Sequence, residues 1–248
     1  MDSKVPQIFI CSKGRAGKTT TDKLLERIPA EYAFVVEPQE AADYTAALRP
    51  NGRVIVLPEG GRGISYSRER TKEIAQAAHE YYIVLDDDIE NFSEVKNGRA
   101  RVTHPDALLK GLEYFKESGL ALMSFEYRQY AWSARKELCV GKSCDCCVFF
   151  NAKKTANVHY DEALRLKGDR DFCVQLALLG ERFGRLNRYA IQVPNLGSNV
   201  GGLQDLYKQR EDEKYAQALF LKYGPKICKL FRKKDGRLDV RIDFNKLY

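Results

Sequence analysis

Three adjacent aspartates, Asp86, Asp87 and Asp88, directly follow a short apolar stretch at residues 81–85. Adjacent carboxylates repel one another, and a bound divalent cation relieves that repulsion. On an extended backbone Asp86 and Asp88 point to the same side, as in the Asp-x-Asp arrangement that holds a metal ion against a diphosphate. The triplet therefore predicts a Mn²⁺ or Mg²⁺ site, and the alternative is a solvated acidic turn or a helix cap.

A second candidate motif begins at Ser12 and continues as Lys-Gly-Arg-Ala-Gly-Lys-Thr-Thr to residue 20. It ends in Gly-Lys-Thr, as a phosphate-binding P-loop does, but Ser12 stands where that loop has its first glycine. The variant loop of partition-type ATPases is closer, although Arg15 replaces one of its glycines and a side chain at such a tight turn is costly. A partition-type ATPase therefore stays as an alternative function.

The elements that would position these motifs alternate along the first half of the chain. Apolar patterns predict strands over 7–11, 32–36, 53–57 and 81–85, with helices over 21–28, 41–48 and 67–78. This alternation is typical of βαβ units and of a largely parallel sheet. Because open sheets of this kind bind ligands at the carboxyl ends of their strands, we expect Ser12, Glu37 and the aspartates to lie at one edge.

The second half has a less regular pattern. It predicts helices over 105–118, 171–179 and 205–223, and strands over 120–127 and 147–151. Asp169 and Asp171 stand where the second of these helices begins, and carboxylates there favour the helix dipole and the free backbone amides. Helix capping is thus the structural alternative to a catalytic role for either aspartate.

Composition limits the function classes. The chain has 248 residues, of which 44% are hydrophobic, and this suits one α/β domain with a short appendage. No apolar run approaches the ~18 residues of a membrane span, and no secretory leader is evident, so we expect a cytoplasmic protein with no membrane partner. The seven cysteines suit reduced thiols, and Cys139, Cys144, Cys146 and Cys147 lie close together without a standard zinc spacing.

The positive charge is concentrated near the end of the sequence. The net charge is +7, and the residues from Lys222 onward contain nine Lys or Arg against three Asp. A basic segment of this kind indicates a polyanionic partner such as DNA, and the alternative is a solubilising tail.

The order of these motifs resembles the GT-A fold of nucleotide-sugar glycosyltransferases. In the large inverting family of that fold an arginine lies about four helical turns before the aspartate motif, and Arg70 occupies this place. The same family carries a Glu-Asp-x-Asp-Phe segment at a later helix entrance. Residues 168–172, Gly-Asp-Arg-Asp-Phe, match it except that glycine replaces the glutamate.

A narrower resemblance covers residues 7 to about 202. It is carried by Ser-Lys-Gly-Arg-Ala at 12–16, Val-Val-Glu-Pro at 35–38, a glycine loop after Pro58, Leu-Asp-Asp-Asp-Ile at 85–89 and Ser-Asn-Val-Gly-Gly at 198–202. These segments look like the glycosyltransferases associated with TET/JBP dioxygenases, which occur in phages and include the base J glucosyltransferase of kinetoplastids. The resemblance implies sugar transfer to a hydroxymethylpyrimidine in DNA, with 5-hydroxymethylcytosine preferred, in the host cytoplasm if a phage encodes the chain.

The resemblance also implies roles for single residues. The nucleotide sugar would be bound by Ser12, Lys13, Gly14, Arg15, Glu37, Gly63, Arg70, Asp86 and Asp87. The metal would be held by Asp88 and Asp86, and the acceptor hydroxyl deprotonated by Asp169 or, failing it, Asp171. The acceptor and its DNA would contact Trp132, Tyr130, Arg135, Asn199, Gly201, Gly202, Lys233 and Lys234. On the sequence alone, the alternative for Arg70 is a solvated helix residue, and the alternative for Trp132 is a core residue.

The sequence therefore predicts an α/β GT-A domain over 1–203, with a mostly parallel central sheet, and a helical basic extension over 204–248. The predicted reaction is metal-dependent, inverting transfer from a UDP-sugar to a hydroxyl. The alternatives are the partition-type ATPase and a non-catalytic nucleic-acid-binding module. The sugar, the choice between cytosine, uracil and non-DNA acceptors, inversion against retention, and the oligomeric state all stay open.

Overall fold

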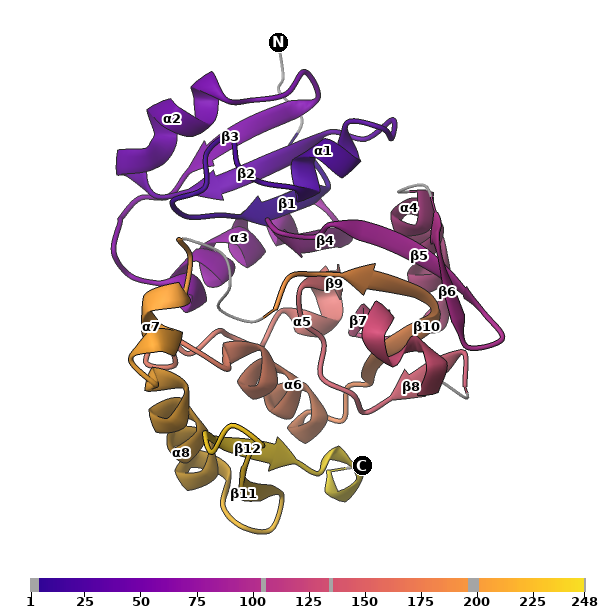
Figure 1. Ribbon diagram of the computed structural model, residues 1–248, viewed down its shortest axis with the longest axis vertical. Helices are drawn as coiled ribbons and strands as arrows, with labels where there is room; N and C mark the ends of the chain where they lie inside the picture. Colours follow the sequence, from indigo (N-terminus) through magenta and orange to yellow (C-terminus); the bar gives the residue numbers. More distant parts are fainter. Residues whose placement is uncertain (1–4, 104–105, 134–135, 196–200, 248) are drawn as a thin grey trace.

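The computed structural model describes residues 5–103, 106–133, 136–195 and 201–247, and one large sheet runs through its centre (Figure 1). The first half of the sheet consists of four parallel neighbours. In sheet order these are β3 (Gly52–Val56), β2 (Tyr32–Val36), β1 (Ile8–Cys11) and β4 (Tyr81–Asp86). Each lies within one residue of its predicted bounds, because each is a continuous apolar run that stops at a polar or glycine-rich turn.

The second half of the sheet mixes strand directions. It continues with β9 (Cys147–Asn151), β7 (Leu122–Tyr127), β10 (Phe183–Gln192), β5 (Asn91–Lys96) and β6 (Arg99–Thr103), and β8 (Leu138–Val140) pairs with β10. β9 runs antiparallel to both of its neighbours, while β7 and β10 are parallel to each other. Most strands thus run in one direction, which confirms the mostly parallel sheet.

Four strands of this half, β5, β6, β8 and β10, were not predicted. β5 and β6 form a hairpin whose two turn residues, Asn97 and Gly98, both have positive φ, at 52° and 71°. Asn-Gly is a strong hairpin signal, but the strands beside it carry charged residues and alternate only weakly. β5 and β6 therefore lacked the apolar periodicity on which the prediction depended.

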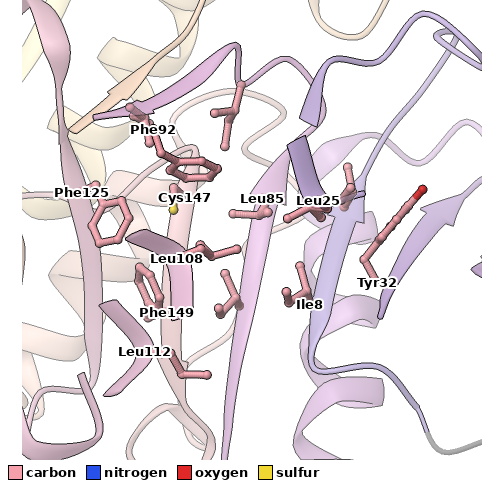
Figure 2. Close-up of a cluster of buried hydrophobic side chains, with 14 of the residues drawn as sticks. Ile8, Leu25, Tyr32, Leu85, Phe92, Leu108, Leu112, Phe125, Cys147 and Phe149 are labelled. Atoms are coloured by element: carbon pink, nitrogen blue, oxygen red, sulfur yellow. The ribbon is translucent and has the colours of Figure 1, made fainter. Parts of the chain in front are cut away.

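Helices cover both faces of the sheet. One face carries α1 (Thr21–Leu25), α2 (Ala41–Ala46) and α4 (Asp106–Ser118), and the other carries α3 (Ile64–Ala78), α5 (Ala152–Thr155) and α6 (Gly168–Leu178). Alternate residues of each strand feed the two hydrophobic layers. Figure 2 shows part of the first layer, in which Ile8 and Leu85 of the strands lie near Leu25 of α1 and Leu108 of α4.

The C-terminal extension differs from the helical prediction. It contains α7 (Gln204–Lys208) and α8 (Glu211–Tyr223), separated at Arg210, whose φ is +57°, and then the hairpin of β11 (Cys228–Arg232) and β12 (Leu238–Ile242). The helical prediction is therefore wrong beyond Tyr223. Residues 238–242, Leu-Asp-Val-Arg-Ile, alternate apolar and charged side chains, a strand pattern that the basic composition obscured.

The extension packs against the domain. Tyr215 and Leu219 of α8 form a hydrophobic cluster with Leu164, Leu166 and the hairpin residue Val240. The 3₁₀ turn Phe244–Lys246 adds an edge-to-face contact between Phe244 and Phe183, with ring centroids 5.1 Å apart. Among the described residues, no helix is long and apolar enough to cross a membrane.

Candidate active site

A cavity of about 750 Å³ opens at the carboxyl ends of β1, β2 and β4. It gathers residues from the donor-side motifs, from the start of α6 and from the C-terminal extension. Of the residues predicted for function, it is lined by Ser12, Lys13, Arg15, Glu37, Gly63, Asp86, Asp87, Asp88, Tyr130, Asp169, Gly202 and Lys233. Ligand sites of α/β sheets form at this edge because successive parallel strands end there together.

The loop after β1, residues 12–15, is tied to the aspartate motif. The Ser12 hydroxyl and the Arg15 guanidinium both contact Asp87, and Arg15 also reaches Asp88 at 3.2 Å. The backbone N–H of Gly14 donates to Glu40, and that of Arg15 donates to the Tyr44 hydroxyl at 3.1 Å. These two amides therefore form hydrogen bonds within the protein, and the loop offers the cavity its side chains.

The engaged amides also argue against the P-loop alternative. A P-loop binds phosphate through backbone N–H groups that converge on the ligand. Here the backbone N–H groups of Gly14 and Arg15 donate to side chains of the protein itself. The Lys18 side chain is exposed and does not line the cavity.

Glu37 lies at the end of β2, where its side chain is only 8% exposed. Lys13 Nζ is 2.8 Å from one of its oxygens, and Gln39 donates to the same carboxylate at 2.5 Å. Burial alone would raise the pKa of Glu37, but hydrogen bonds from Lys13, the Gly61 backbone and Gln39 outweigh it and lower the pKa. Glu37 is thus held as a carboxylate that accepts hydrogen bonds at the cavity wall.

Each carboxylate of the aspartate triplet has a different environment. Asp86 accepts a hydrogen bond of 2.9 Å from Arg68, Asp87 is 5% exposed, and the Asp88 side chain is 28% exposed at the cavity. Burial raises the pKa of Asp87 to about 6, against the opposing effects of Arg15 and Ser12. The repulsion among the three carboxylates is therefore reduced by Arg68 at Asp86, by Arg15 at Asp87, and by partial exposure to solvent at Asp88.

The carboxylates of Asp86 and Asp88 suit a metal ion that takes its remaining ligands from a substrate and water. Among the described residues, no three His, Cys, Asp or Glu side chains are grouped as a preformed metal cage. Ions such as Mg²⁺ at nucleotide sites use one or two carboxylates and take their other ligands from phosphates and water. Asp88 and Asp86, both part-exposed at the cavity, can supply such a pair.

The two arginines of α3 face different surroundings. Arg68 lines the cavity, and its guanidinium bonds Asp86. Arg70, the predicted diphosphate ligand, lies outside the cavity lining, pairs with Glu73 at 2.7 Å and stacks over Tyr66. Residues two apart on a helix are about 200° apart around its axis, so Arg68 lines the cavity and the predicted Arg70 does not.

Asp169 and Asp171 also separate. Asp169 lines the cavity, half-buried, in the first turn of α6. Asp171 is fully buried and is held by the Tyr223 hydroxyl at 2.6 Å, by Gln175 at 2.7 Å and by Lys222 at 2.8 Å. Asp171 thus fastens α8 to the domain, and Asp169 alone of the pair is placed to meet a substrate.

The predicted acceptor residues are dispersed. Tyr130, in the 3₁₀ turn Arg128–Ser133, lines the cavity and is 51% exposed, whereas Trp132 is 75% exposed outside it, in neither the cavity nor the core. Lys233 lines the cavity and Lys234 does not. Arg135 and Asn199 lie outside the described residues.

Gly201 and Gly202, although far along the sequence, lie against the loop of residues 12–15, which we call the donor loop. The N–H of Gly202 donates to the Lys13 carbonyl at 3.1 Å, and a Cβ built on Gly201 would stand 3.1 Å from the carbonyl oxygens of Lys13 and Gly14. Both glycines have positive φ, at 86° and 57°. Both glycines, which were predicted as acceptor contacts, therefore lie beside the loop of residues 12–15.

Several cavity residues were missed by the sequence patterns. Lys167 and Arg170 at the start of α6 both bond the buried Asp239 of β12, at 2.7 and 2.8 Å, and Lys233 bonds it at 3.0 Å. Tyr207 and Asp212 of the extension also line the cavity, as does Asp145 before β9. Arg170 lies within the 168–172 segment but was given no role there, and no motif surrounds Tyr207 or Asp212, which only the packing of the extension brings to the site.

The clustered cysteines are free thiols. Cys144 and Cys147 are buried, and Cys139 and Cys146 are partly buried. Among the described residues, no three metal-ligating side chains are grouped here either, so the cluster offers no zinc site within that part of the chain.

Comparison with known proteins identifies this architecture. A crystal structure of GalNAc-T7 with UDP, GalNAc and Mn²⁺ matches with a TM-score of 0.52 at 10% identity, covering 88% of this chain and 51% of that one. The chain therefore spans about half the length of that structure. A crystal structure of a mycobacterial protein matches with a TM-score of 0.54 at 10% identity, covering 97% of this chain and 84% of that one. The shared architecture is the GT-A fold.

The sequence itself supports the same assignment. No curated protein matches it. The family model described as TET-Associated Glycosyltransferase, however, matches residues 6–202, which include the donor loop, the aspartate triplet and Asp169. The chain belongs to the TET-associated glycosyltransferase family and is a glycosyltransferase of the GT-A fold.

Proposed function

We propose that this glycosyltransferase uses a UDP-sugar and a divalent cation, and that it glycosylates a 5-hydroxymethylpyrimidine in DNA, preferentially 5-hydroxymethylcytosine. The observation that carries the proposal is the convergence of three groups on one cavity. They are the cationic donor loop with the aspartate triplet, the open carboxylate Asp169, and the basic rim made by Lys167, Arg170 and Lys233. We place the reaction in the cytoplasm.

The donor side supports a nucleoside diphosphate. Lys13, Arg15 and Arg68 bring three cations to the carboxyl end of β1 and β4, where a diphosphate would carry negative charge. Glu37 would accept hydrogen bonds from the base or ribose. The choice of UDP is supported by GalNAc-T7, whose crystal structure contains UDP and GalNAc in the same fold.

The metal would be held by Asp88 with Asp86, and Mn²⁺ in the GalNAc-T7 structure supports this choice. When bound, the ion would neutralise the negative charge that develops on the departing diphosphate. Arg68 fixes the Asp86 carboxylate and Arg15 contacts Asp88, so these residues would hold both ligands in position before a donor enters.

Asp169 would act as the general base. It would take the proton of the acceptor hydroxyl while the oxygen attacks the sugar carbon and the nucleoside diphosphate leaves, which gives inversion at that carbon. Asp171, two residues on, cannot share this role, since all three of its hydrogen-bonding partners hold it in the interior.

The basic residues and the exposed tyrosine at the cavity support DNA as the acceptor, with the target base flipped out of the double helix. A hydroxymethyl group in a stacked base cannot align with a sugar inside a cavity, so the nucleotide must be flipped out at a cost of a few kcal/mol. Lys167, Arg170 and Lys233 surround one carboxylate, Asp239, which leaves excess positive charge for phosphate contacts. Tyr130, half-exposed at the cavity, can stack on the extruded base.

The test is a matrix of donors and acceptors. UDP-sugars are offered with Mn²⁺ to hydroxymethylcytosine DNA, hydroxymethyluracil DNA, unmodified DNA, and protein and lipid acceptors. Transfer should require the hydroxymethyl group and should stop in EDTA. Transfer to protein or lipid alone would remove the DNA acceptor, and full activity in EDTA would remove the metal.

A further inference from the structure

Asp212, in the first turn of α8, is a buried carboxylate whose oxygens lack hydrogen bonds. It is 1% exposed, and neither oxygen has a hydrogen-bond donor among the residues that the structure describes. The nearest cation, Arg237, stands 3.5 Å away and is bonded more closely to Asp235, at 2.7 Å. Burying a carboxylate without hydrogen bonds is costly, so a residue of this kind indicates a missing donor.

The missing donor lies in the cavity, because Asp212 is part of its lining. Tyr207 of the same extension also lines the cavity, together with Asp169 and Asp86. Burial raises the pKa of Tyr207 most, and the negative charges of Asp169, Asp212 and Asp86 raise it further. Asp212 therefore lines the same space as the proposed base and the proposed metal ligands, and a bound sugar would lie in this space.

We infer that Asp212 accepts hydrogen bonds from hydroxyl groups of the transferred sugar, an inference that rests on the proposed UDP-sugar donor. An anionic wall repels the phosphates of the donor and of DNA, which have their cations elsewhere, at Lys13 and Arg15 or at Lys233. The ligand part that suits Asp212 is neutral and rich in O–H donors, and a hexosyl group has that chemistry.

This assignment places a sugar-selecting residue in the C-terminal extension. Asp212 lies beyond residues 6–202, the part that matches the family model. The nucleotide and metal would then be bound by the family region, and the sugar would be read in part by a segment outside it.

The test separates the sugar from the nucleotide. Binding of UDP and of UDP-glucose, UDP-galactose and UDP-N-acetylglucosamine is measured by calorimetry with Mn²⁺, in the wild type and in Asp212→Asn and Asp212→Ala. The affinity for UDP should be unchanged. The affinity for the best UDP-sugar should fall about 10-fold or more in Asp212→Ala, which corresponds to about 1.4 kcal/mol.

A stability measurement and a matched control exclude an indirect effect. Removing an unsatisfied charge should leave the ligand-free melting temperature of Asp212→Asn equal to or above that of the wild type. Asp235→Asn removes a carboxylate from the same arginine but lies away from the cavity, and it should leave all affinities unchanged.

The contrary results are distinct. Equal losses for UDP and UDP-sugar, no loss for either, or a lower melting temperature in Asp212→Asn would overturn the role of Asp212. A wild type that binds no UDP-sugar would overturn the proposed donor itself, and the inference would fall with it.

Discussion

Replacing Asp239 by asparagine should strongly destabilise the protein. The carboxylate is 2% exposed and holds three cations, Lys167 at 2.7 Å, Arg170 at 2.8 Å and Lys233 at 3.0 Å, and it accepts the N–H of Val240 at 2.8 Å. The substitution keeps the shape and leaves three positive charges facing one another. It removes the central ion pairs between the hairpin and the start of α6.

The magnitude follows from the burial of the pairs. Removing one partner of a buried ion pair costs about 3–5 kcal/mol, because the other partner stays behind as an uncompensated charge. Since native proteins are stable by only about 5–15 kcal/mol, this is a large fraction of the whole. Lys167 is the most buried of the three cations, with its side chain 9% exposed, and burial already lowers its pKa.

The effect should depend on pH in a defined direction. Burial would raise the pKa of Asp239, but Arg170, Lys167 and Lys233 outweigh it and hold the pKa below its ordinary value. A carboxylate with a depressed folded-state pKa contributes stability that is complete above the unfolded pKa of about 3.9 and is lost as the pH falls through the lower folded value. The difference between wild type and variant should therefore be constant at neutral pH and shrink below about pH 4.

Urea denaturation at pH 7 and at a series of acidic pH values measures this difference. Asp235→Asn, a change at an exposed residue of the same hairpin, is the control and should leave the unfolding free energy nearly unchanged. A loss in Asp239→Asn no larger than in this control, or one that does not change with pH below 4, would refute the reasoning.

Three further substitution experiments test the site. Asp88→Asn should abolish transfer while the circular dichroism spectrum and melting temperature stay close to those of the wild type, and retained turnover would remove Asp88 from the metal site. Asp169→Asn should lower kcat by ~10²-fold or more with donor affinity nearly unchanged. Asp171→Asn should mainly lower the melting temperature. The reverse pattern, measured by steady-state kinetics and thermal melts, would exchange the roles of the two aspartates. Arg68→Ala should weaken UDP binding in calorimetry and Arg70→Ala should not, and equal losses would contradict the placement of Arg68 against Asp86.

The first half of the fold could be predicted because its chemistry and its strands coincide. β1, β2 and β4 are apolar runs that end in polar residues, so the pattern that marks each of these strands also marks where its ligand-binding end lies. The meeting of the Ser12 loop, Glu37 and the aspartate triplet in one cavity follows from this topology alone.

The rest depended on facts that a linear pattern does not contain. Helical position decides between Arg68 and Arg70, and burial decides between Asp169 and Asp171, yet each pair has the same residue type two positions apart. The hairpin after Tyr223 was not predicted because that segment was interpreted from its basic composition, and the alternation of apolar and charged residues over 238–242 was not used. Asp212 has no motif, and its importance appears only when its surroundings leave it without a hydrogen bond.

The extension beyond residue 203 forms one wall of the cavity, and this has an evolutionary consequence. Mutations in α7, α8 and the hairpin can reshape the site through Tyr207, Asp212 or Lys233 while the donor loop and the aspartate triplet stay intact. Substrate preference and catalytic competence can thus diverge at different rates within one active site. Exchanging residues 204–248 between two members of the family should transplant selectivity as a unit, provided that Asp171 and the Asp239 ion pairs are matched on both sides of the junction.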